Sequence, residues 1–146
     1  MYHPRNLAVV AALLLGLALG WTTASLRAEP DRKESMVYEL RSYTTLDGRL
    51  PALNDRFKNH TMKLFEKHGM TNVAYWTVVD NDGKPVDNKL VYVLAHKNRE
   101  AAAASWAAFR SDPEWNSARE ASEKDGKIVS KAEAQFLVPT GYSPMK

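Results

Sequence analysis

Two apolar runs decide the fold of this chain: residues 72–80 read NVAYWTVVD and residues 89–96 read KLVYVLAH. Both runs are rich in β-branched and aromatic residues, which favours strands. Residues 81–88 between them read NDGKPVDN, and an Asp-Gly pair followed by proline is typical of a turn. The segment therefore predicts a β-hairpin.

Both strands of this hairpin are apolar on both faces. Successive residues of a strand point to opposite faces of the sheet. In the first strand, one face carries Val73, Tyr75 and Val79, and the other carries Ala74, Trp76 and Val78. In the second strand, one face carries Leu90, Tyr92 and Leu94, and the other carries Val91, Val93 and Ala95. A strand that is apolar throughout is normally buried on both sides. We therefore expect both faces of the sheet to be covered.

A strand and a helix precede the hairpin. Residues 36–45 read MVYELRSYTT and alternate as a strand does. Beyond them, side chains recur at steps of three and four, with Pro51 near the start and Gly69 just past the end, which predicts an amphipathic helix. The recurring residues are Leu50, Leu53, Phe57, Thr61, Leu64 and His68.

A second helix and a last strand follow the hairpin. An alanine-rich helix is predicted from about Asn98 to Phe109, with an interruption at residues 111–113. There Asp112 can cap, and Pro113 can open, a renewed helix that runs to about residue 125. Residues 131–140 read KAEAQFLVPT and predict a strand that ends at the proline.

The resulting order is βαββαβ. It predicts an α+β, ferredoxin-like fold, with a four-stranded antiparallel sheet and two helices on one face. One helical layer leaves the other face uncovered, although the two hairpin strands are apolar there too. In a chain this short, a second copy can supply the missing cover. We therefore expect a two-fold homodimer whose sheets pack face to face.

Four segments carry a resemblance to a known family. They are YELRSYT at residues 38–44, GRL at 48–50, the helix at 57–68, and WAAFRSDPEW at 106–115. In this order and spacing, residues 36–142 resemble a NIPSNAP domain. The resemblance implies a dimeric α/β barrel and no defined chemistry. Related dimeric α/β-barrel families include cofactor-independent oxygenases, isomerases and haem-handling enzymes, an analogy at the level of the fold.

Residues 1–28 have the layout of a secretory signal peptide. The basic, acid-free start MYHPRN precedes an apolar run from Leu7 to Leu19, which is shorter than the roughly 18 residues of a spanning helix. Ala24 and Ala28 are the two candidate cleavage positions; we take Ala28 as the boundary, and an uncleaved anchor is the alternative. Cleavage leaves no stable membrane anchor. We therefore expect export to the periplasm or the medium.

Charge and cysteine content narrow the remaining possibilities. Loss of Arg5 and Arg27 with the signal peptide takes the formal net charge from +3 to +1. The other charges are interspersed without a basic stripe, so a nucleic-acid partner is not expected. The chain has no cysteine, so its stability depends on packing or association. Residues 29–35 are charged and non-periodic, which indicates a flexible lead-in to a single domain at 36–142.

His60 is the candidate catalytic residue. It lies one position from the helix stripe that holds Thr61, so its imidazole is expected to border the cleft between helix and sheet, where it could act as acid, base or ligand. The favoured interpretation is a half-buried structural histidine that is hydrogen-bonded to a backbone carbonyl or water. No histidine pair has the spacing of a metal motif, and no nucleophile has a recognisable base, so neither a metal site nor a cofactor is predicted.

Aromatic residues define a candidate pocket. The aromatic residues are mostly expected in the core; the alternative is that Tyr38, Tyr75, Trp106 and Phe109 line an apolar site with His60 as its polar group.

The first strand is expected to contribute its polar side to the dimer. Glu39, Arg41 and Tyr43 share one face of this strand and are assigned to the dimer face, where Glu39 and Arg41 can pair across the two-fold axis.

Two functions are compatible with these patterns. The first is a non-catalytic, exported homodimer that binds a small apolar ligand or a protein partner. The second is a cofactor-independent monooxygenase or isomerase that uses His60 with Tyr38 or Tyr75. The absence of a paired acid–base signature in the sequence favours the first.

Overall fold

The computed structural model describes residues 36–145. The signal peptide expected at residues 1–28 and the lead-in expected at 29–35 lie outside the described residues. Within the part that is described, no helix is long and apolar enough to cross a membrane.

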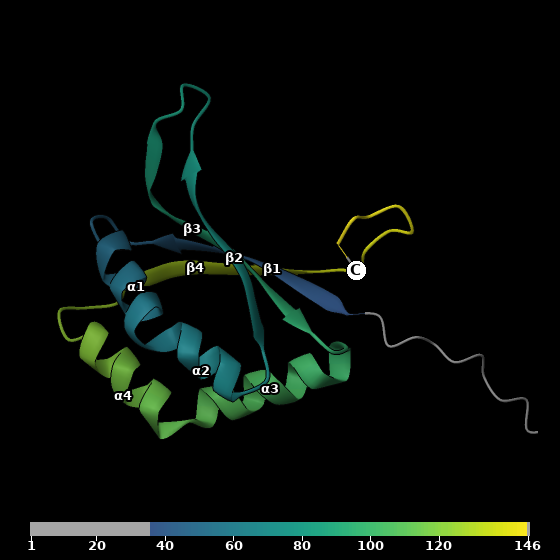
Figure 1. Cartoon of the computed structure of the whole chain (residues 1–146). Coiled ribbons are helices and arrows are strands. Elements are labelled where there is room, and N and C mark those ends of the chain that lie inside the picture. The colour runs from purple at the N-terminus through teal and green to yellow at the C-terminus, as the bar shows by residue number, and fades with distance from the viewer. Residues whose placement is uncertain (1–35, 146) are drawn as a thin grey trace, which may run out of the picture. The chain divides into compact units, whose positions relative to one another are not determined.

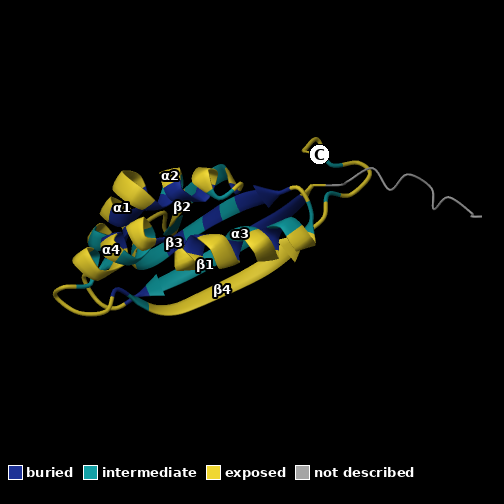
Figure 2. Cartoon of the chain, turned by 90° about the horizontal axis from the view of Figure 1, so that it is seen from below, coloured by how far each residue is buried: buried dark blue, intermediate teal, exposed yellow. Residues whose placement is uncertain are grey.

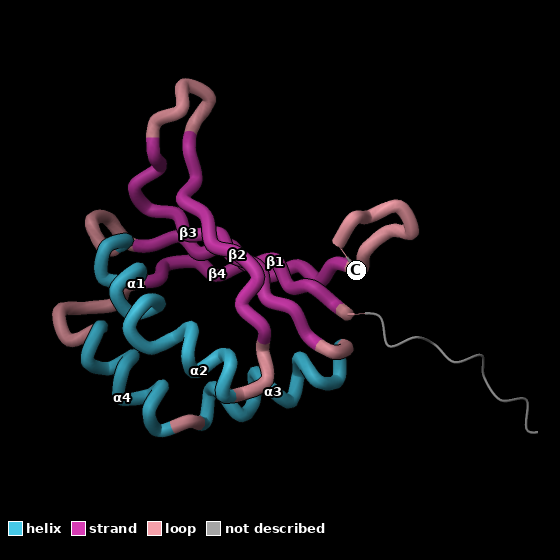
Figure 3. Tube along the Cα trace, viewed as in Figure 1, coloured by secondary structure: helices cyan, strands magenta, loops and turns pink. Residues whose placement is uncertain are grey.

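The element order confirms the predicted βαββαβ arrangement. The elements are β1 (Val37–Thr45), α1 (Leu50–Arg56), η1 (Phe57–Thr61), α2 (Met62–Lys67), β2 (Thr71–Val79), β3 (Pro85–His96), α3 (Arg99–Ser111), α4 (Pro113–Ser122) and β4 (Val129–Leu137). The strands form one antiparallel sheet in the order β2-β3-β1-β4. All the helices lie on one side of the sheet (Figure 1, Figure 3).

The first helix contains a π turn that the sequence pattern did not predict. Segments α1, η1 and α2 run on as one helix, but within η1 the N–H of Met62 donates to the carbonyl of Phe57 five residues back. The hydroxyl of Thr61 also donates to the carbonyl of Arg56, at 3.2 Å. The wider turn keeps both Phe57 and Thr61 buried. It also changes which neighbouring residues face the sheet.

The break in the second helix lies at Asp112, within the interruption predicted at residues 111–113. Helix α3 begins after Asn98, whose Oδ1 accepts from the N–H of Ala101 at 2.8 Å. Helix α4 begins after Asp112, whose Oδ1 accepts from the N–H of Glu114 at 2.8 Å, with Pro113 in its first turn. Both helices are thus capped by side chains at their N-termini.

The hairpin turn is shorter than predicted. Strand β3 begins at Pro85 rather than at residue 89, because the tight turn at 80–84 satisfies itself. In that turn, Oδ1 of Asp80 accepts from the N–H groups of Asp82 and Lys84, and Gly83 has a φ of 76°. A positive φ of this kind favours glycine.

The core lies between the sheet and the helices. On β3, Leu90, Tyr92 and Leu94 face the helices, since each is buried in one cluster with helix side chains. The helix residues of that cluster include Leu53, Phe57, Leu64, Phe65, Trp106 and Phe109. The predicted alternation of β3 is therefore confirmed.

The opposite face of the sheet has no helix over it in the described chain. Trp76 on β2 is 49% exposed there, and Val91 and Val93 are only half-buried. Strand β4 is an edge strand and is exposed over nearly its whole length (Figure 2). The apolar part of this face on β2 and β3, and the edge strand β4, are therefore exposed in the described chain.

Candidate functional site

A cavity of about 560 Å³ lies between the sheet and the helices. Strand β1, both helical segments around the π turn, helices α3 and α4, and the start of β4 all contribute to it. Its lining residues are Tyr43, Arg56, Phe57, Thr61, Phe65, Trp106, Phe109, Trp115, Arg119, Glu123, Lys127 and Val129. The volume lies within the range of small-molecule sites, roughly 300–1,000 Å³.

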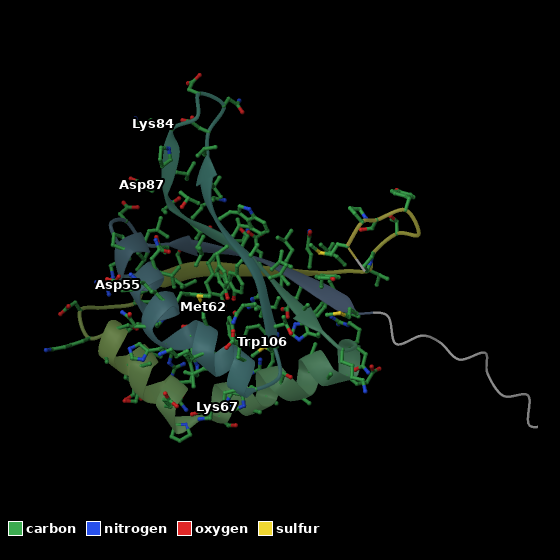
Figure 4. The ribbon with its side chains drawn as sticks, in the orientation of Figure 1. Asp55, Met62, Lys67, Lys84, Asp87 and Trp106 are labelled. Atoms are coloured by element: carbon green, nitrogen blue, oxygen red, sulfur yellow. The ribbon has the colours of Figure 1, made fainter. Side chains whose placement is uncertain are left out.

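Aromatic rings form the inner part of this cavity. Phe57 lies edge-on to Tyr43, with ring centroids 6.1 Å apart. Across the cavity, Phe109 lies 4.5 Å from Trp115 and 5.6 Å from Trp106, centroid to centroid. In Figure 4, Trp106 lies in the layer between the strands and helix α3. Such rings offer flat apolar surfaces to a ligand.

Two further tyrosines pack behind these rings. Tyr75 stacks on Tyr92 at 5.4 Å, and both rings also touch Phe57. Burial raises the pKa of both phenols, and for Tyr92 the neighbouring Tyr43 raises it further. These tyrosines therefore stay neutral at physiological pH.

The π turn supplies one wall of the cavity. Because the turn is wide, it presents the side chains of Arg56, Phe57 and Thr61 to the cavity together. The Arg56 side chain is only 4% exposed, and its guanidinium lies 5.3 Å from the ring centre of Trp115. Its Nη1 donates to Oγ of Ser122 at 3.1 Å. A desolvated guanidinium thus lies beside an aromatic face.

The cavity opens at the connection from α4 to β4. Arg119 and Lys127 are exposed and Glu123 is half-buried, whereas Phe57, Phe65 and Phe109 are buried. The charged residues therefore form the rim, and the apolar residues form the interior. This arrangement suits a ligand with an apolar body and a polar end.

A buried charge network lies next to Trp106. Glu39, which is 1% exposed, accepts from Nε1 of Trp106 at 2.6 Å, from Nε2 of His96 at 3.0 Å and from Nη1 of Arg41 at 2.6 Å. The guanidinium of Arg41 also lies 4.4 Å from the ring centre of Trp106. The network thus fixes the orientation of an aromatic wall of the cavity.

The pKa values within this network favour its charged state. Burial would raise the pKa of Glu39, but the hydrogen bonds from His96, Trp106 and Arg41 lower it on balance. Burial opposes the charge of Arg41, yet Tyr43, Tyr92 and Glu39 raise its pKa on balance. The Glu39–Arg41 pair is therefore ionised in the folded protein.

The expected faces of β1 are reversed in the structure. Glu39, Arg41 and Tyr43 were assigned to the dimer face, but they point toward the helices, and Glu39 pairs with Arg41 of its own chain. Tyr38 was assigned to the pocket, but it lines a groove on the opposite face with Trp76. The alternation of β1 was predicted correctly, but the wrong set of residues was expected to face the helices. The carboxylate of Glu39 can face the helices because Trp106 and His96 form hydrogen bonds with it there.

His60 lies outside the cavity, contrary to expectation. It is exposed, and it lines a shallow groove between the π turn and α4 with Asn59 and Ser122. In an ordinary α-helix it would border the stripe of Phe57 and Thr61. The wider π turn rotates it away from the sheet. The acid, base or ligand role expected for His60 in the cavity is therefore not supported.

The other expected pocket residues lie near one another. Trp106 and Phe109 both line the cavity, while Tyr75 packs against its inner rings without lining it. Sequence reasoning missed the lining residues Arg56, Trp115, Arg119, Glu123 and Lys127. On α4, the four-residue steps from Trp115 to Arg119 to Glu123 were a usable signal, since such residues share one helix face.

Residues 36–145 contain no group of three or more His, Asp or Glu side chains placed to hold a metal ion.

Comparisons with known proteins agree with the fold. A family model described as NIPSNAP matches residues 38–144. A NIPSNAP family protein of unknown function from Agrobacterium tumefaciens is similar in structure, with a TM-score of 0.64 and 23% identity over 77% of this chain and 96% of that one. A NIPSNAP-like domain protein from Burkholderia xenovorans has a TM-score of 0.63 and 17% identity over 76% and 90%.

A more distant similarity extends to an oxygenase. A variant of SnoaB, a cofactor-independent oxygenase from Streptomyces nogalater, has a TM-score of 0.50 and 14% identity, over 75% of this chain and 98% of that one. At this identity the similarity concerns the fold alone. A comparison with curated proteins gave no match.

Proposed function

The chain belongs to the NIPSNAP family, and from that premise we propose that it is a binding module that holds a small, largely apolar ligand in the cavity between its sheet and its helices. The observation that carries this proposal is a cavity of about 560 Å³ whose inner wall is aromatic and whose rim is charged. Ligand sites commonly combine an apolar interior with a few polar groups that fix orientation.

Side chains of the cavity wall are held in place by hydrogen bonds, which supports a role of the cavity in ligand binding. Trp106 is fixed through its indole N–H by the buried Glu39, and Arg56 is fixed by Ser122. Side chains held in this way lose little conformational entropy when a ligand arrives. The cavity is therefore preorganised.

We further propose that the module acts as a homodimer through the open face of its sheet. That face carries the exposed Trp76, and beside it a groove of about 230 Å³ is lined almost wholly by apolar residues, including Tyr38, Val93 and Leu137. A second copy offers the same apolar surface, so two such faces can bury each other around a two-fold axis. This arrangement would leave the cavity on the outer side of each sheet.

Export remains part of the proposal because residues 1–28 have the layout of a signal peptide.

An oxygenase or isomerase activity is the alternative function. With His60 outside the cavity, the residues that line it offer Tyr43, Glu123 and Lys127 as proton carriers, and Glu123 is paired with Arg56 at 3.4 Å. Binding without chemistry therefore fits these groups better.

The test of ligand binding is to block the cavity with a larger side chain. Val129→Trp places an indole at the rim, and Ser117→Trp places the same group at an exposed position of α4 that does not line the cavity. Native mass spectrometry of the purified protein should detect a small molecule retained by the wild type, Ser117→Trp and His60→Ala. Val129→Trp should retain none while it keeps its circular dichroism spectrum.

Two results would contradict the proposal. One is retention of the same molecule by Val129→Trp as by the wild type. The other is the failure of every form to retain a molecule or to take up an added aromatic compound.

A further inference from the structure

Charge is distributed unequally around the cavity. The lining holds three basic side chains, Arg56, Arg119 and Lys127, but one carboxylate, Glu123. Glu123 lies 3.4 Å from Nη1 of Arg56, so this pair accounts for one of the three cations. Within residues 36–145, neither Arg119 nor Lys127 takes part in an ion pair. The rim therefore carries excess positive charge.

The pair with Glu123 compensates Arg56 only in part. Burial lowers the pKa of Arg56, and the like charge of Arg119 lowers it further, against the opposing effect of Glu123. The Nε of Arg56 is also buried without a hydrogen-bond partner among the described residues. A buried cation with an unused donor and a cationic neighbour is stabilised by an anion placed close to it.

Nothing on the inner wall opposes a negative charge at the rim. The tyrosines behind the aromatic rings are neutral at physiological pH, and the carboxylate of Glu39 is turned toward Arg41, His96 and Trp106. The sign of the potential inside the cavity is therefore determined by its basic residues.

We infer that the cavity takes a small aromatic molecule that carries a negative charge. Its ring system lies against the aromatic side chains of α3 and α4, and its charged group lies at the rim beside Arg119 and Lys127. The inference rests on the proposed function, because it specifies the ligand of the same cavity.

Two fluorescent probes with the same ring system test the sign of the charge. 1-Anilinonaphthalene-8-sulfonate is an anion, and N-phenyl-1-naphthylamine is its neutral counterpart. We expect the wild type to bind the anionic probe about tenfold more tightly than the neutral one, since an anion gains charge-assisted contacts at the rim. Added salt should weaken only the anionic probe, because screening acts on charges at the exposed rim.

Substitutions of basic residues locate the effect. Arg119→Gln combined with Lys127→Gln should lower the affinity for the anionic probe about tenfold and leave the neutral probe unchanged. The matched control is Arg110→Gln combined with Lys124→Gln, which removes two exposed cations that do not line the cavity. This control should bind both probes as the wild type does.

Two further variants separate the cavity from the open sheet face, which can also attract aromatic probes. Val129→Trp should abolish binding of both probes to the cavity, and Trp76→Glu should remove only binding to the open face. The cavity signal is the part that Val129→Trp abolishes.

Each outcome has a definite meaning. Equal cavity affinities for the two probes would overturn the inference and leave the proposed function standing. Equal losses of the anionic probe in the rim pair and in its control would also overturn it. If Val129→Trp changes neither probe, the cavity binds neither of them, and the proposed function fails together with the inference.

Discussion

Glu39 shows how a single buried residue can fix the orientation of Trp106 in the wall of the cavity. Its carboxylate is buried at 1% exposure, and its three donors come from the same strand, from β3 and from α3. A buried charge is tolerated when it is hydrogen-bonded and paired with an opposite charge. Glu39 therefore links the sheet to the helix that carries Trp106.

Replacing this carboxylate should destabilise the protein. Glu39→Gln keeps the size of the side chain but leaves Arg41 without its counter-charge. We expect a loss of about 2 kcal/mol in the free energy of unfolding, measured by urea denaturation. Glu133→Gln is the matched control, because its pair with Lys131 at 2.7 Å is exposed, and it should change little. Equal effects of the two substitutions would contradict the role given to Glu39.

The same residue should leave a signature in the pH dependence of stability. The folded-state pKa of Glu39 lies below its ordinary value of 4.5. Its stabilising contribution is therefore fully present above pH 4.5 and is lost as the pH falls through the folded-state pKa. The stability gap between the wild type and Glu39→Gln should narrow as urea denaturation is repeated from pH 7 downward. A gap that widens on acidification would show that the sign is wrong.

Individual residues were the hardest level to predict from sequence. The alternation of β1 was evident, but a pattern of period two does not say which face turns inward, and the polar set was placed on the wrong side. His60 was misplaced because a π turn has no recognisable local signature. Trp106 and Phe109 were found because a three-residue step on a helix marks its packing face.

Among the elements, the junction of α3 and α4 depends most visibly on side-chain chemistry. Asp112 caps α4, and its Oδ2 also accepts from Nε2 of His68 at 2.6 Å and lies 2.8 Å from Nζ of Lys67. Hydrogen bonds from Lys67 and His68 hold the pKa of Asp112 well below its ordinary value. One carboxylate thus caps α4 and joins it to the end of α2.

Two cap substitutions separate these roles. Asn98→Ala removes only the cap of α3 and should cost about 1 kcal/mol in the free energy of unfolding. Asp112→Ala removes a cap together with the contacts to Lys67 and His68, so its melting temperature should fall further than that of Asn98→Ala. Differential scanning calorimetry of the two variants provides the comparison. Equal melting temperatures would mean that the tie to α2 contributes nothing.

The elements were largely predictable because their signals are local. Pro51, Gly69, Asp112 and Pro113 mark helix ends directly in the sequence, and the structure has ends close to each of them. The start of β3 was missed by four residues, because Asp80 closes the turn with its own side chain and so shortens it. Contacts of that kind are not visible in a pattern of apolar residues.

On the scale of the whole molecule, the open sheet face is the feature from which the dimer is proposed. The hairpin strands β2 and β3 are apolar on both sides, as the sequence indicated, but helices cover only one side of the sheet in the described chain (Figure 3). Stable dimers bury roughly 800 Å² on each copy, an area that the face of a four-stranded sheet can supply.

The dimer can be tested with one charge on that face. Trp76→Glu should convert the protein from dimer to monomer in size-exclusion chromatography with light scattering, because a carboxylate at an apolar interface is costly to desolvate. Leu46→Glu is the control, since Leu46 is similarly exposed, at 45% against 49%, but lies in the loop after β1. A monomeric wild type, or a dimeric Trp76→Glu, would refute the proposed interface.

The central claim is that the cavity between the sheet and the helices is the ligand site. A crystal structure of the protein with bound 1-anilinonaphthalene-8-sulfonate tests it most directly. The account predicts density for the naphthalene rings beside Trp106, Phe109 and Trp115, with the sulfonate within reach of Arg119 or Lys127. Density for the probe only beside Trp76 on the open face, with the cavity empty, would contradict it.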